Sequence, residues 1–103
     1  MARKVVWAHE AIEDIDATAG YIARDSPYYA SAFVQEVLDV GRSLDVVSSR
    51  GRVVPEIGNQ NIRELFVREY RMIYCIEKGR VVILGLIHGR RDLENLLKKG
   101  KRR

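Results

Sequence analysis

The first half of the chain changes from a strand pattern to a helical one. Lys4–Ala8 reads KVVWA, a β-branched and aromatic run that predicts a strand. Apolar residues then recur at three- and four-residue steps, which places one apolar stripe on a helix from about 9 to 24. Ser26 and Pro27 suit the N-cap and first position of a second helix, which continues to about 46 or 47. We therefore predict two antiparallel helices in a hairpin, with Tyr28 and Tyr29 as packing residues.

The second half predicts an antiparallel meander. Residues 48–61 are rich in Ser, Gly and Asn and indicate a loop, with a short extended piece at Val53–Val54. Strands are expected at 62–68, 70–77 and 81–88, with Lys78–Gly79 as the tight turn between the last two. Both faces of this meander are apolar, and one helical hairpin can cover only one of them. We expect the C-terminal segment, a partner chain or both to cover the other.

The turn at Lys78–Gly79 predicts a register for the last two strands. With two loop residues, Glu77 faces Arg80, Arg71 lies opposite Leu86, and Glu69 lies opposite His88. Arg71 and His88 would then share one face of the sheet as diagonal neighbours.

Composition predicts one soluble intracellular domain. The 103 residues suffice for a single core, and 47 % apolar with 31 % charged residues is typical of globular proteins. We assign residues 1–97 to the domain and 98–103 to a basic tail. Asp92 can cap a short last helix, 93–98, whose leucines would help to cover the sheet. No signal peptide or membrane span is apparent, and the lone Cys75 fits a reducing cytoplasm.

Charge separates the two halves of the chain. Residues 1–60 carry six Lys/Arg against nine Asp/Glu, and residues 61–103 carry twelve against five, which gives −3 and +7. This asymmetry either indicates a polyanionic or acidic partner, or reflects solubility charge and a basic tail.

Cationic side chains gather near the end of the predicted meander. Arg71, His88, Arg90 and Arg91 combine guanidinium forks, which match phosphate or carboxylate oxygens, with an imidazole that can transfer a proton near neutral pH. This chemistry would suit phosphodiester cleavage. Alternatively, Arg71 pairs with a nearby glutamate, His88 pairs with Glu69, and the last two arginines are surface charge. No metal or cofactor site is expected, because the two histidines and one cysteine lack ligand spacing.

The ordered motifs resemble the RelE/ParE superfamily of toxins from bacterial type II toxin–antitoxin, or plasmid stabilisation, systems. The similarity covers about residues 5–93 and is carried by WAHEAIEDIDATAGYIARDSP, SRGRVVPE, IREL, EYRMIY and VVILGLIHGRRD. It implies an α+β fold of order β-α-α-β-β-β(-α), with a helical hairpin packed on a twisted antiparallel sheet. It also implies neutralisation by a cognate antitoxin that wraps apolar and basic surfaces.

The resemblance implies two possible targets. RelE-like members are ribosome-dependent endonucleases of mRNA, which would make Arg71, His88 and Arg91 catalytic. ParE-like members inhibit growth by acting on DNA gyrase and need no such active site. The series GR…IREL…YR…HGRR and the long hairpin look closer to the ParE-like branch. In either branch, the residues expected to bind target or antitoxin are Arg63, Arg71, His88, Arg90, Arg91, Leu93 and Leu96.

Overall fold

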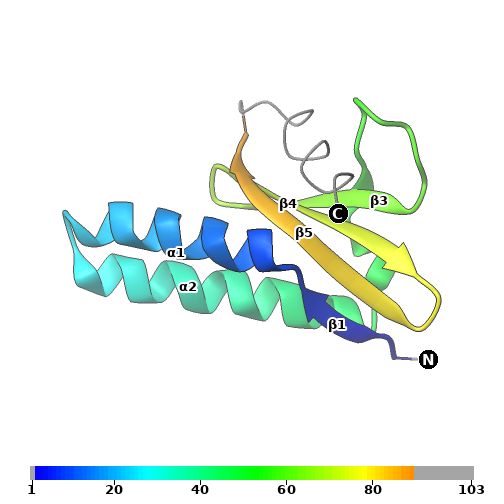
Figure 1. Cartoon of the computed structure of the whole chain (residues 1–103), viewed down its shortest axis with the longest axis horizontal. Helices are drawn as coiled ribbons and strands as arrows, with labels where there is room; N and C mark the ends of the chain where they lie inside the picture. The colour runs from blue at the N-terminus through cyan, green and yellow to red at the C-terminus, as the bar shows by residue number, and fades with distance from the viewer. Residues whose placement is uncertain (1, 90–103) are drawn as a thin grey trace.

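The computed structural model describes residues 2–89, which form a helical hairpin packed on one sheet (Figure 1). The elements are β1 (Lys4–Trp7), α1 (His9–Ala23), α2 (Pro27–Arg42), β2 (Arg52–Val53), β3 (Ile62–Val67), β4 (Tyr70–Glu77) and β5 (Arg80–His88), with two single-turn 3₁₀ helices, Ser43–Asp45 and Ser48–Arg50, between α2 and β2. The predicted α+β fold and element order are confirmed. The predicted last helix at 93–98 lies outside the described residues.

The hairpin forms where the sequence pattern places it. Ser26 caps α2, since its hydroxyl oxygen accepts a hydrogen bond from the Tyr29 N–H at 3.2 Å, and Pro27 occupies the first turn. The joined ends of α1 and α2 project beyond the strands (Figure 1). Tyr28 and Tyr29 lie at this tip and are 77 % and 60 % exposed, so the prediction that they pack was wrong. Helix α2 ends at Arg42, earlier than the predicted end at about residue 46 or 47.

The sheet is mixed, with strand order β1-β5-β4-β3-β2. All neighbours are antiparallel except β1 and β5, which pair in parallel from Lys4↔Arg80 to Trp7↔Ile83. After Trp7 the chain continues into α1, so β1 pairs with only the first part of β5. Further along β5, the Asp14 carboxylate of α1 accepts a hydrogen bond from the Leu86 N–H at 3.0 Å. A helix side chain thus supplies a partner that the short first strand cannot reach.

A bulge in β5 changes the predicted register. The Lys78–Gly79 turn pairs Glu77 with Arg80 as expected, with Gly79 at φ +79°. Tyr74 then pairs with Ile83 but Ile73 pairs with Gly85, so Leu84 has no cross-strand partner in the register. Beyond this bulge every pair is displaced by one residue.

The displaced register corrects two predicted pairs. Arg71 lies opposite Ile87, and not Leu86, while His88 lies opposite Tyr70, and not Glu69. Because successive side chains point to opposite faces of a strand, Arg71 and His88 lie on opposite faces of the sheet.

The main core lies between the hairpin and the sheet. Its fully buried members include Phe33 and Val37 of α2 with Met72, Tyr74 and Ile83 of the sheet. The two layers approach so closely at Gly41 that a Cβ atom there would overlap the indole of Trp7. The absence of a side chain at Gly41 therefore sets the distance between α2 and the β1 end of the sheet.

A second, smaller apolar cluster covers the sheet face away from the helices, which we call the distal face. Val54 and Ile73 are fully buried there, and the partly buried residues packed against them are Ile57, Ile62, Leu84 and Ile87. Val54 and Ile57 belong to the loop of residues 54–61, which we call the strap. The strap thus covers part of the apolar surface that the sequence assigned to the C-terminal segment or to a partner. Within residues 2–89, no helix is long and apolar enough to cross a membrane.

Candidate functional site

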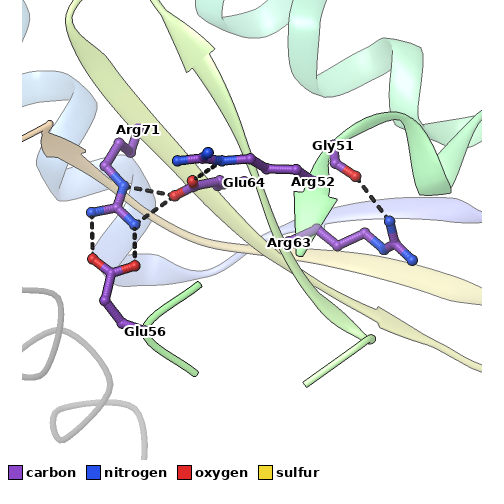
Figure 2. Close-up of polar contacts among 6 residues, drawn as sticks. All are labelled: Gly51, Arg52, Glu56, Arg63, Glu64 and Arg71. Carbon is purple, nitrogen blue, oxygen red and sulfur yellow. Dashed lines mark hydrogen bonds and ion pairs between the residues drawn. The ribbon is translucent and has the colours of Figure 1, made fainter. Parts of the chain in front are cut away.

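Arg71 lies on the distal face with its guanidinium between two carboxylates (Figure 2). Its Nε donates to Oε1 of Glu64 at 2.6 Å, and its Nη1 and Nη2 donate to the two oxygens of Glu56 at 3.0 Å each. Glu64 comes from the neighbouring strand β3, and Glu56 comes from the strap. The side chain of Arg71 is nearly buried, so this cation is held by protein oxygens in place of water.

Glu64 is a fully buried carboxylate shared by two arginines. Oε2 accepts from Nε of Arg52 at 2.5 Å, while Oε1 accepts from Arg71. Arg52 pairs with Glu64 across β2 and β3, so the two face the same side of the sheet. The guanidinium of Arg52 also lies 5.8 Å from the ring centroid of Phe66. We call Arg52, Glu56, Glu64 and Arg71 the distal cluster. Its two positive and two negative charges balance.

Within the distal cluster, the surroundings of Glu56 and Arg71 favour the ionised forms of these two groups. The hydrogen bond from Arg71 is the main cause that lowers the pKa of Glu56 below its usual range. The bonds to Glu56 and Glu64 raise the pKa of Arg71 against the opposing effect of its burial. Arg71 therefore holds its positive charge at every physiological pH.

His88 stands apart from this cluster, on the helix side of the sheet. Its ring lies 5.6 Å from that of Tyr70 in an edge-to-face arrangement, and Tyr70 in turn contacts Phe33. The sequence predicted Arg71 and His88 as neighbours on one face, and the bulge at Leu84 overturns that placement. Arg71 and His88 are therefore not positioned to contact the same ligand.

The other predicted site residues are dispersed or lie beyond the described part of the chain. Arg63 turns away from the distal cluster, and its guanidinium donates to the carbonyl oxygen of Gly51 at 2.9 Å (Figure 2). It also donates to the carbonyl oxygen of Gln60 at 2.9 Å. These bonds tie β3 to the segments on either side of β2. Arg90, Arg91, Leu93 and Leu96 lie outside the described residues. Among residues 2–89, no group of His, Cys, Asp and Glu could hold a metal ion.

Sequence reasoning missed the two carboxylates that hold Arg71. One signal was available for Glu64. It lies two residues from both Ile62 and Phe66 on a strand, and residues at that spacing share one face of the sheet. A carboxylate directed toward an apolar sheet face requires a cationic partner. Glu56 lies in a loop, where no periodicity indicates its direction.

The described body of the protein has almost no net charge. Residues 2–89 contain eleven Lys/Arg and twelve Asp/Glu, net −1, whereas residues 90–103 contain seven and two, net +5. The positive charge that the sequence suggested for the sheet end therefore belongs to the last fourteen residues.

Comparison with known proteins decides the family. A family model described as the ParE toxin of the type II toxin–antitoxin system parDE matches residues 5–93. The chain belongs to the ParE toxin family. This match spans all the described strands and helices except the first residue of β1. A search of curated proteins found no significant match.

Solved structures share the fold of this ParE-family protein. The chromosomal ParDE toxin–antitoxin system from P. aeruginosa aligns with a TM-score of 0.70 and 20 % identity, over 84 % of this chain and 96 % of that chain. The toxin–antitoxin complex RelBE2 from Mycobacterium tuberculosis aligns with a TM-score of 0.57 and 19 % identity, over 85 % and 99 % of the two chains. At such identities the likeness concerns the fold alone.

Proposed function

We propose that this ParE-family protein arrests growth by binding DNA gyrase, and that a cognate antitoxin neutralises it. The match to the ParE toxin of a parDE system over residues 5–93 carries this proposal. The family description supplies the roles of toxin and antitoxin, and the gyrase target is our extension of it. The solved ParDE and RelBE2 relatives are themselves toxin–antitoxin systems, which supports a partner protein here.

The geometry of the distal cluster favours binding over cleavage of RNA. A ribonuclease built on Arg71 and His88 would need both groups at one phosphate, with the guanidinium available to the developing charge. Arg71 instead donates to two carboxylates, and His88 lies across the sheet. The net charge of −1 on residues 2–89 also gives the folded body little attraction for a polyanion.

The candidate surface for target or antitoxin follows the end of β5. We propose that His88, Arg90 and Arg91 contribute cationic contacts there and that Leu93 and Leu96 contribute apolar ones. Arg63 takes part through the segments that it holds in place, and Arg71 takes part through its guanidinium on the distal face.

A gyrase assay tests the target. Purified protein should inhibit supercoiling by gyrase in a concentration-dependent way and increase cleaved DNA, and an excess of cognate antitoxin should restore activity. The double variant Arg90→Ala, Arg91→Ala should inhibit less. The double variant Lys78→Ala, Arg80→Ala, which removes two exposed cations at the opposite end of β5, is the matched control and should inhibit like the wild type. Gyrase left untouched at high protein concentration would refute the target.

Mapping mRNA ends after induction distinguishes the RelE-like alternative. We expect the ends to match those of an uninduced culture during growth arrest. New ends at ribosome-occupied codons would instead establish mRNA cleavage.

A further inference from the structure

The strap is held to the distal face by two contacts of different kinds. Val54, at its start, is fully buried, and its N–H donates to the Ile62 carbonyl at 3.2 Å. The middle of the strap is held through Ile57, which packs on the smaller core, and through the two bonds from Arg71 to Glu56. Gly58 follows at φ +73°, where the chain turns back toward β3. The buried start is therefore fixed, and the middle depends on Glu56 and Ile57.

The Glu56–Arg71 pair can be opened at little cost. The Glu56 side chain is 51 % exposed, whereas that of Arg71 is 6 % exposed. When the pair opens, the Glu56 carboxylate regains water on its exposed side, which limits the cost on that side of the pair. Arg71 would remain paired with buried Glu64. Removal of Glu56 thus leaves Arg52, Arg71 and Glu64 in place with a net charge of +1.

The surroundings of Arg71 determine which ligand fits after Glu56 leaves. The guanidinium edge that Glu56 occupies accepts a planar carboxylate in two parallel bonds. Its cross-strand neighbours are apolar, namely Ile87 on one side and Phe66, 53 % exposed, on the other. A sugar–phosphate backbone does not match such neighbours, and the described body lacks the positive field that would attract one. A peptide that carries an acidic residue next to an aliphatic one does match them, as Glu56–Ile57 does in the strap.

We propose that Glu56 is an intramolecular competitor of the antitoxin, and that an acidic–aliphatic segment of the antitoxin displaces it to bind Arg71 on the distal face. This inference rests on the proposed toxin–antitoxin function. In the free toxin, the strap would cover the apolar surface of the distal face and neutralise the charge of the distal cluster until the antitoxin binds.

Calorimetric titration with purified cognate antitoxin tests the competition. Glu56→Gln keeps the size of the side chain but weakens its hold on Arg71, so this variant should bind antitoxin about two- to fivefold more tightly, the range expected for an exposed ion pair. Glu36→Gln is the matched control, since Glu36 is similarly exposed and pairs singly with Arg68. The control should bind like the wild type. An unchanged or weaker affinity for Glu56→Gln would overturn the proposal.

Hydrogen exchange provides a second readout that does not depend on a variant. The N–H groups of Ile57 and Gly58 both donate to the Val54 carbonyl and report on the folded strap. Saturating antitoxin should accelerate their exchange while protecting the amides of β4. Slower exchange at both strap amides would mean that the antitoxin packs on an intact strap, which contradicts displacement. Absence of any binding to the wild type would instead count against the toxin–antitoxin function itself.

Discussion

Replacement of Tyr74 by phenylalanine should be one of the most destabilising single-atom changes in this protein. Tyr74 is fully buried on β4, and its hydroxyl donates to the Ser48 carbonyl at 2.7 Å and accepts from the Gly51 N–H at 2.8 Å. Ser48 and Gly51 are themselves buried, so water cannot replace the lost partner. The hydroxyl thus fixes the segment between α2 and β2 to the centre of the sheet.

The magnitude follows from the two backbone groups left without a partner. Each buried, unsatisfied group costs about 1–3 kcal/mol, so Tyr74→Phe should lower the free energy of unfolding by roughly 2–6 kcal/mol. For a domain of this size, 1 kcal/mol shifts Tm by about 4 °C, which predicts a decrease of roughly 8–24 °C. Total stabilities are only about 5–15 kcal/mol, so the variant should lose a substantial share of its stability.

Urea unfolding monitored by circular dichroism, together with a thermal melt, measures this loss. Tyr28→Phe is the control, because it removes the same atom from a side chain that is exposed at the hairpin tip, and its stability should stay within about 0.5 kcal/mol of the wild type. If Tyr74→Phe also stayed within that range at an unchanged m-value, the two hydrogen bonds would not anchor the segment and our reasoning would be wrong.

Three further changes probe the helices and the distal cluster. Gly41→Ala should destabilise the protein by about 1–3 kcal/mol in urea unfolding, because the new methyl group overlaps Trp7, and the exposed Gly20→Ala in α1 should instead be neutral or stabilising. Ser26→Ala removes the cap of α2 and should cost about 1 kcal/mol, measured in the same way. Because the folded pKa of Glu56 is lowered from 4.5, its pair with Arg71 adds stability above about pH 4.5 that is lost as the pH falls through the lower folded value. Glu56→Gln should therefore show a shallower acid decline than the wild type in melts from pH 7 to pH 3, and an identical decline would show that the pair is not linked to folding.

The parts of the fold that could be predicted are those governed by local periodicity. The helices followed from apolar spacing and the Ser26–Pro27 start, and the β4–β5 turn followed from Lys78–Gly79. The β5 bulge could not be placed in the same way, because both faces of the strand are apolar and alternation does not distinguish one register from the next. Gly85 was the available sign, since a glycine inside a strand often marks a bulge.

The candidate site was harder to predict because its geometry depends on distant parts of the chain. Arg71 was recognised as important, and the alternative that it pairs with a local glutamate is what the structure shows for Glu64 and Glu56. The prediction that His88 lies beside Arg71 was wrong, because one extra residue in β5 places His88 on the other face of the sheet. The one-residue bulge in β5 is therefore the reason that Arg71 forms a structural ion pair and not the predicted catalytic pair with His88.

The parallel pairing of β1 with β5 also sets the order in which the protein can be completed. Lys4 pairs with Arg80, which lies 76 positions later in the chain. At about 5–20 residues per second of synthesis, the N-terminal strand must wait roughly 4 to 15 seconds for its partner. Until then Lys4–Trp7 cannot take its place, and prematurely terminated chains that stop before β5 can never close the sheet. For a chain of the ParE toxin family, only products that extend through β5 would then acquire a finished fold.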